Sequence, residues 1–182
     1  MTLAPSLTSP TALYRKLERE SYRALHSHSR VHKADHFFNF CVTAHAMRDY
    51  VLEYLGKIKR KDQQPFHDEW SKIPALVAVK DIANCSKHFV LRDRKTTNRK
   101  PPSNMAVRPR RSKFVDVYSN GKGKFEFVEV DKPDISIKLS DDTVLLLHEL
   151  THEIMSYWRE YLSRLGITVR RQPVSQLIGN VA

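Results

Sequence analysis

The sequence contains only two cysteines and no long run of apolar residues. Cys41 and Cys85 each lie in an apolar stripe of an expected helix, so we predict two buried, reduced thiols rather than a disulfide, and a cytoplasmic location. No apolar run approaches the roughly 20 residues of a membrane-spanning helix, so we expect no membrane partner. The N-terminal segment lacks a basic region followed by an apolar core, and we therefore expect no secretion signal.

Acidic residues are also scarce. There are 20 Asp and Glu against 31 Lys and Arg, which gives a formal net charge of +11. An excess of this size favours a polyanionic partner, and nucleic acid is the commonest one. The chain has 182 residues, of which 41% are hydrophobic, and this is enough to bury the core of one globular domain.

We expect this domain to be mainly α: a helical bundle with an inserted β-hairpin or three-stranded β-meander before the last helix. The domain should span residues 9–166. A flexible leader, residues 1–8, precedes it, and a C-terminal tail, residues 167–182, follows it. We find no internal repeat.

Two helices are expected in the first third of the chain. The Ser-Pro pair at residues 9–10 is typical of an N-cap and a first helical position, and leucines at roughly helical spacing follow it. A second helix is predicted over residues 35–58, with Asp35 as its N-cap. It is apolar on two sides, which is typical of a helix buried between partners. Residues 59–73 are polar and predict a loop anchored by Trp70.

Several histidines belong to these two helices. His45 and Asp49 are one helical turn apart and are expected partly inside the bundle, where they can orient one another or face a site on a neighbouring helix. A satisfied core pair without chemistry is the alternative. Four more histidines cluster nearby: His26, His28, His32 and His36. No cysteine or well-placed carboxylate completes a metal site around them, so we expect them to be surface side chains.

The most informative stretch is residues 74–91, which predicts a helix opened by Pro74. One face of this helix is apolar, and the other gathers a carboxylate, an amide, an imidazole and two ammonium groups. They belong to Lys80, Asp81, Asn84, Lys87 and His88. Residues three, four and seven apart share a helix face, so these groups can converge on one spot as a candidate catalytic site. A structural polar network joining this helix to a neighbour is the alternative.

Most of the excess positive charge lies in residues 92–113. This segment contains nine Lys and Arg and a single Asp, and three prolines within it exclude a regular helix. We predict a mobile basic arm that contacts a phosphate backbone without reading base sequence, while a merely solubilising loop is the alternative. The candidate nucleic-acid-binding residues are Arg92, Arg94, Lys95, Arg99, Lys100, Arg108, Arg110, Arg111 and Lys113.

Alternating apolar and polar residues predict strands after the arm. Residues 114–119 and 124–130 flank an Asn-Gly pair, which is a strong hairpin signal, and residues 134–139 form a third expected strand. A last helix is predicted from Thr143 to about Leu165. Residues 140–142 should cap it, and Gly166 should end it.

The last helix also contains an HExxH motif. His148, Glu149 and His152 match the zinc-hydrolase pattern, in which two histidines hold a metal and the glutamate activates water. A catalytic zinc needs a third protein ligand, and residues 161–182 contain no His, Asp, Glu or Cys. We therefore predict no metal or other cofactor, and a zinc hydrolase is the weakest of the functional interpretations.

The order of these segments resembles the HEPN-like family of bacterial proteins. The resemblance rests on FNFCVTAHAMRDYVLEYL, a linker tryptophan, KDIANCSKHF, a β-hairpin and SYWREYLSRLG, and it covers roughly residues 35–165. The family's ribonuclease motif is an arginine, most often followed by asparagine, with a histidine four to six residues later. Asn84 and His88 match the second half of this motif, but Ala83 occupies the arginine position.

The resemblance implies a helical bundle, often dimeric, of a phage-defence or toxin–antitoxin type. It implies RNA as the partner and metal-independent cleavage as the activity. His88 would be the general acid and base, Asn84 would position it, and Lys80 and Lys87 would stabilise charge on phosphorus, with His45 and Asp49 around them. A catalytically inactive relative that serves as a binding or adaptor subunit is the alternative.

Overall fold

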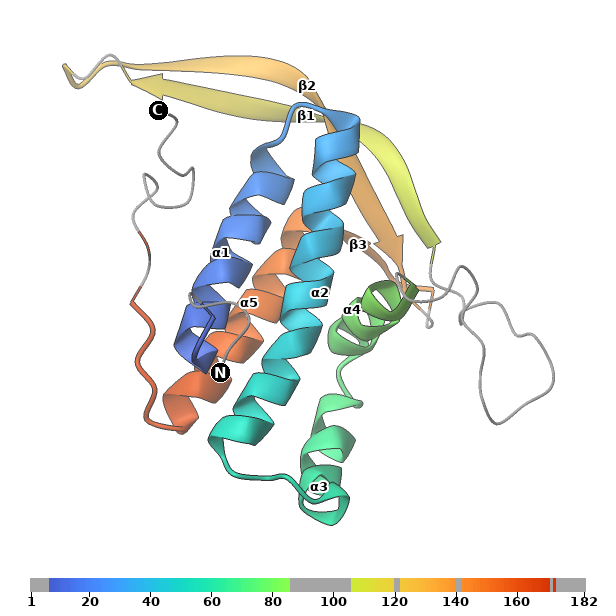
Figure 1. The fold of residues 1–182 in the computed structure, drawn as a ribbon. Coiled ribbons are helices and arrows are strands. Elements are labelled where there is room, and N and C mark those ends of the chain that lie inside the picture. The colour runs from blue at the N-terminus through green and yellow to red at the C-terminus, as the bar shows by residue number, and fades with distance from the viewer. Residues whose placement is uncertain (1–6, 86–105, 120–121, 140–141, 171, 173–182) are drawn as a thin grey trace.

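The computed structural model describes residues 7–85, 106–119, 122–139, 142–170 and 172. The chain is mainly helical, with a small three-stranded antiparallel sheet, and its elements follow in the order α1, α2, α3, α4, β1, β2, β3, α5 (Figure 1). The predicted fold class is confirmed at this level. Within the described residues, no helix is both long enough and apolar enough to cross a membrane.

Helices α1 (Pro10–His26) and α2 (Arg30–Tyr54) form a long antiparallel pair. The predicted start of α1 is confirmed, because the Ser9 side chain accepts a hydrogen bond from the Ala12 N–H. The predicted start of α2 is wrong: Ser29 is its N-cap and accepts from the His32 N–H. Asp35 lies inside the helix, because the chain reverses already at residues 27–29.

Helix α3 (Arg60–Trp70) occupies the segment that we predicted to be a loop. Phe66 and Trp70 are one turn apart and both are buried, and burial of two large aromatic side chains offsets the hydrogen bond lost at Pro65 inside the helix. The prediction that Trp70 anchors this segment is confirmed.

Helix α4 (Pro74–Cys85) packs against α2 and α5 (Leu147–Arg164). Its apolar face is buried, as predicted, and Pro74 is its first residue. Residues 86–91 of the predicted helix lie outside the described part of the chain. Together with α1, these helices enclose a core whose largest fully buried side chains include Tyr14, Leu17, Phe40, Met47, Leu76, Leu150, Ile154 and Trp158.

The sheet is longer and differently divided than the sequence predicts. Strands β1 (Ala106–Ser119) and β2 (Phe125–Lys138) pair along their whole length, from Ala106 opposite Lys138 to Ser119 opposite Phe125. The hairpin therefore takes in residues 106–113 of the predicted basic arm, and residues 134–138 continue β2 rather than form a third strand. Pro109 is tolerated because β1 is an edge strand.

The third strand is β3 (Val144–Leu146), which pairs with residues 136–138 of β2. The prediction that the last helix starts at Thr143 is thus wrong, and Val144 is an exposed strand residue rather than part of the helix. Helix α5 begins at Leu147, and the Glu149 carboxylate accepts a hydrogen bond from the Leu146 N–H (2.7 Å) instead of a cap at residues 140–142. Gly166, with φ +74°, follows the last turn as predicted.

The hairpin crosses the end of the bundle where α1 turns into α2, and its distal part extends beyond the helices (Figure 1). Lys33 of α2 is 1% exposed and donates to the carbonyl oxygens of Ala24 (2.8 Å) and Leu25 (2.9 Å) at the end of α1. Its ammonium group also lies 5.9 Å from the ring centroid of Phe114 in β1. One buried lysine of α2 thus joins the end of α1 by hydrogen bonds and lies near an aromatic ring of β1.

Candidate nucleic-acid interface

The described part of α4 brings together three of the predicted catalytic residues. Lys80, Asp81 and Asn84 are each partly exposed, and the Lys80 ammonium lies 3.7 Å from a carboxylate oxygen of Asp81. Lys87 and His88 lie outside the described residues. The polar face predicted for this helix is therefore present as far as Asn84, and the Asn84–His88 motif stays a prediction.

His45 and Asp49 of α2 do not share one environment. His45 is partly buried, with its ring centroid 6.0 Å from that of Trp70. Asp49 is 64% exposed, and its carboxylate accepts from the Arg48 guanidinium at 3.0 Å. The prediction that Asp49 lies partly inside the bundle is wrong. The two residues are one helical turn apart, but the ring of Trp70 in α3 lies beside His45, whereas the Asp49 side chain is exposed to solvent.

The predicted basic arm divides into two parts. Arg92, Arg94, Lys95, Arg99 and Lys100 lie outside the described residues. The backbone of Arg108 belongs to β1, and the side chains of Arg110, Arg111 and Lys113 are exposed on the same strand. These four candidate residues are therefore fixed on a strand rather than on a mobile loop.

Two of these arginines line a pocket of about 280 Å³ together with the first residue of α2. We call this the basic pocket; it is formed by Arg30, Pro109, Arg110, Arg111 and Pro133. The two prolines give it rigid walls, because each pyrrolidine ring fixes its backbone φ angle. Arg30 is distant from the arm in sequence, and no motif or spacing connects the two.

Buried charges beneath the basic pocket hold β1 in place. Asp134 of β2 is buried, accepts a hydrogen bond from the Ser112 hydroxyl (2.9 Å), and lies 3.6 Å from Nε of Arg110. Lys132, also buried, pairs with Asp116 across the hairpin. Burial lowers the pKa of Lys33, with Asp134 opposing this shift and Lys132 adding to it. One guanidinium group of the basic pocket, that of Arg110, therefore lies beside a buried carboxylate.

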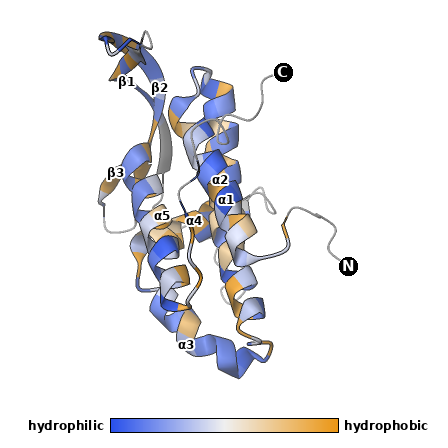
Figure 2. Cartoon of the chain, turned by 90° about the vertical axis from the view of Figure 1, so that its left-hand side faces the viewer, coloured by the Kyte–Doolittle hydropathy of each residue, from blue (hydrophilic) through white to orange (hydrophobic). Residues whose placement is uncertain are grey.

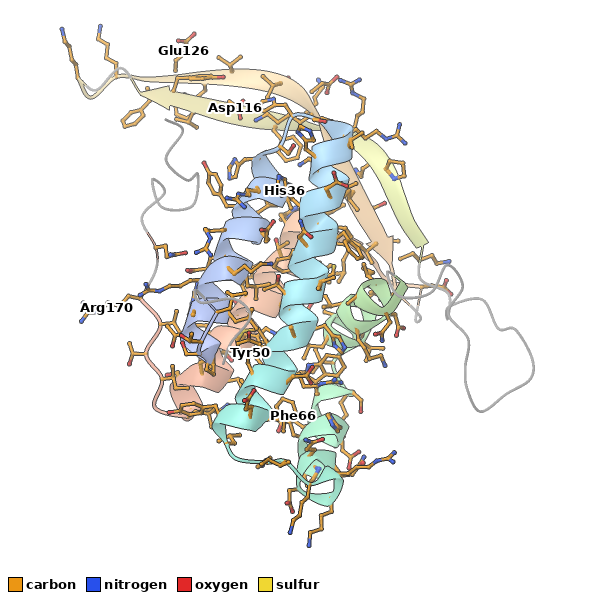
Figure 3. The ribbon with its side chains drawn as sticks, viewed as in Figure 1. His36, Tyr50, Phe66, Asp116, Glu126 and Arg170 are labelled. Atoms are coloured by element: carbon orange, nitrogen blue, oxygen red, sulfur yellow. The ribbon has the colours of Figure 1, made fainter. Side chains whose placement is uncertain are left out.

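A second pocket, of about 220 Å³, lies at the α1–α2 turn. This histidine pocket is formed by Tyr22, Arg23, His26, Ser27, His32 and His36. Figure 3 shows His36 on α2 beside α1, near the end that the hairpin crosses. Glu20, which is 8% exposed, accepts from Arg23 (3.3 Å) and lies 3.1 Å from Nδ1 of His36.

The surface position expected for these histidines is confirmed for His26, His28 and His32, which are exposed, but the sequence did not predict that three of the histidines share a pocket. The reversal at residues 27–29 brings His26, at the end of α1, to the same pocket as His32 and His36 at the start of α2. A signal was present in Ser27 and Ser29, since a serine before a helical pattern or after one is typical of a helix end.

The HExxH residues occupy the exposed face of α5. His148 and His152 are both exposed, and the Glu149 carboxylate is engaged by the backbone N–H of Leu146. Among the described residues, no three His, Cys, Asp or Glu side chains are close enough to hold a metal ion. In the described part of the chain, Glu149 of this motif therefore caps the start of α5, and its histidines do not belong to a metal site.

Comparisons with models of protein families, with curated proteins and with solved structures gave no match for this chain.

Proposed function

We propose that this chain is an HEPN-like protein of the cytoplasm that binds RNA along its sugar–phosphate backbone. The observation that supports this most directly is the basic pocket, in which Arg30 of α2 and Arg110 and Arg111 of β1 meet at one concave surface. A guanidinium group presents five N–H donors in a planar fork, which matches the geometry of a phosphate. Cys41 is fully buried, and burial raises the pKa of its thiol, which fits a reduced cysteine.

The sequence carries further positive charge before β1. Residues 92–100 contain five Lys and Arg, which can add contacts to phosphates of a bound RNA. Contacts of this kind depend on charge and not on base identity. We therefore expect affinity for single-stranded RNA of many sequences, with a strong dependence on salt.

The test is the binding of a fluorescently labelled single-stranded RNA, measured by anisotropy over a series of salt concentrations. The double variant Arg30→Gln/Arg111→Gln should weaken binding and reduce the slope of log K against log salt by about 0.7 for each phosphate that the variant no longer neutralises. The matched control is Arg15→Gln/Arg170→Gln, which removes the same charge from two exposed arginines outside the pocket. Equal losses of affinity in both double variants would contradict a specific role of the basic pocket.

The family resemblance adds a second proposal, cleavage of RNA at Asn84 and His88. The partly exposed Lys80 and Asn84 on α4 support it, because they lead directly into the segment that contains Lys87 and His88. Loss of cleavage in both Asn84→Ala and His88→Ala would support the family site, assembled across a homodimer. Binding that survives these changes, without cleavage by the parent protein, would instead favour an inactive adaptor subunit.

A further inference from the structure

The histidine pocket gathers groups that the proposed RNA binding does not use. It contains three imidazoles, a guanidinium and a phenol from two helices, with a buried carboxylate beneath them. Imidazole is the side chain whose charge changes near neutral pH, so one imidazole can remove a proton and another can donate one, while a guanidinium binds a phosphate.

We propose that the histidine pocket is a ribonucleolytic site in which His26 is the general base, His36 is the general acid and Arg23 binds the scissile phosphate. This inference rests on the proposed function, since it requires that the chain binds RNA. It is separate from the Asn84–His88 motif, which begins on α4, a helix that packs against the opposite side of α2 from α1 (Figure 1).

The surroundings of the two histidines differ in the way that the two roles require. The ring of His36 is held through Nδ1 by the buried Glu20 carboxylate, 3.1 Å away, so its Nε2 edge is left for a substrate. The carboxylate holds the imidazole ring in one orientation, so that Nε2 can present a proton to a leaving group. Arg23 contacts the other oxygen of the same carboxylate and retains N–H donors for a phosphate.

The ring of His26 lies instead against an aromatic side chain, stacked on Tyr22 with the ring centroids 4.2 Å apart. Burial lowers the pKa of His26, and the charges of Lys132, Lys33 and His28 lower it further while Asp116 opposes them. This direction favours the neutral imidazole, which is the form that accepts a proton.

The reaction balances without any further reagent. His26 removes the proton of a ribose 2′-hydroxyl while the 2′-oxygen attacks the adjacent phosphorus. The bond from phosphorus to the 5′-oxygen breaks, and His36 donates its proton to that oxygen. The products are a 2′,3′-cyclic phosphate and a 5′-hydroxyl, and Arg23 stabilises the extra negative charge that the phosphoryl oxygens carry in the transition state.

The position of the pocket suits a bound RNA strand. Ser27 lines the histidine pocket and Arg30 lines the basic pocket, so the two pockets flank the same short turn between α1 and α2. A strand whose backbone is bound in the basic pocket can continue over this turn into the histidine pocket. The basic pocket would then supply affinity and the histidine pocket would supply chemistry.

The experiment uses the full chain, a labelled oligoribonucleotide and a buffer containing EDTA. We expect cleavage products that end in a 2′,3′-cyclic phosphate, identified by mass spectrometry, and no cleavage when every 2′-hydroxyl is methylated. His26→Gln and His36→Gln should each reduce the cleavage rate about 100-fold or more. His152→Gln, which changes an exposed histidine of α5, is the matched control and should leave the rate unchanged.

Binding of the methylated RNA, measured in parallel, separates this inference from the proposed function. Salt-dependent binding without cleavage would overturn the histidine site and leave the proposed function standing. Cleavage that survives in His26→Gln and His36→Gln but is lost in His88→Ala would overturn it in favour of the family motif. Absence of binding would overturn both. Circular dichroism of each variant checks that a reduced cleavage rate does not result from unfolding of the chain.

Discussion

The helical bundle and the β-hairpin of this chain are held together by different forces. Leu17, Phe40 and Trp158 of the bundle are completely buried. In the distal half of the hairpin, Val117, Phe125 and Phe127 are instead 56%, 62% and 69% exposed, and Figure 2 shows hydrophobic residues on the hairpin beyond the helices. Apolar burial therefore stabilises the bundle, whereas the distal hairpin is held chiefly by its own backbone ladder.

The two regions meet through buried polar groups as well as through the apolar core, to which β2 contributes Ile135 and Ile137. Lys33, Lys132 and Asp134 are all buried and lie where the hairpin crosses the α1–α2 turn. Buried charges are costly unless they are paired, so an arrangement of the hairpin that left one of them unpaired would be destabilised. Both pockets lie at this junction, where such precision is useful to a binding site.

The largest expected effect is in the bundle core. Trp158→Ala should lower the free energy of unfolding by about 3–5 kcal/mol, because the substitution removes a fully buried indole and leaves a cavity among the helices. Chemical denaturation followed by circular dichroism at 222 nm measures it. A loss below about 1 kcal/mol would show that the helices are not held together by this core.

A smaller loss is expected at the junction. Lys33→Met should cost about 1–3 kcal/mol, because the buried carbonyl groups of Ala24 and Leu25 lose their hydrogen-bond donor. The same denaturation experiment applies, with Lys113→Met on the hairpin as the control, since that lysine is 77% exposed. If both variants are destabilised by the same amount, Lys33 does not join the two regions.

Alkaline pH should destabilise the bundle through Tyr14. Burial raises the pKa of Tyr14 to about 12 from an ordinary value of 10, and its hydroxyl donates to the Met155 carbonyl (3.2 Å). Between about pH 10 and pH 12 the unfolded state loses a proton that the folded state keeps, so stability falls as the pH rises. In Tyr14→Phe the free energy of unfolding should fall less over this pH range. In Tyr118→Phe, on the exposed hairpin, it should fall as much as in the parent chain. Denaturant titrations at a series of pH values measure both.

The smallest expected effect is at the distal hairpin. Phe127→Ser should change the free energy of unfolding by no more than about 0.5 kcal/mol, because the side chain is 69% exposed and buries little on folding. Thermal unfolding of the variant beside the parent chain measures it. A cost near that of Trp158→Ala would mean that a partner, such as a second copy, covers this face in solution.

Local chemistry made part of the fold predictable. The Ser9–Pro10 start of α1, the Pro74 start of α4 and the turn of α5 at Gly166 were all predicted correctly, because caps and glycine turns depend on a few adjacent residues. The loop predicted at residues 59–73 was wrong because the helix there depends on burial of Phe66 and Trp70 against other elements, which no local pattern contains.

The same distinction between local sequence patterns and tertiary packing applies to the candidate sites. Spacing and charge alone identified the polar face of α4 and the arginines of β1. They did not identify Arg30 as a neighbour of Arg110, or His26 as a neighbour of His36, because each pair is formed by elements that meet only after the α1–α2 reversal and the crossing of the hairpin.

The sequence by itself determined that this protein is basic and mainly helical, since these properties are sums or periodicities of single residues. Only the tertiary structure decided which charges are buried, where strands replace residues 106–113 of the expected arm and the expected helix start, and which residues share a pocket. The physical reason is that burial and proximity depend on the packing of distant segments, and local propensity yields wherever that packing buries more apolar surface or pairs more polar groups.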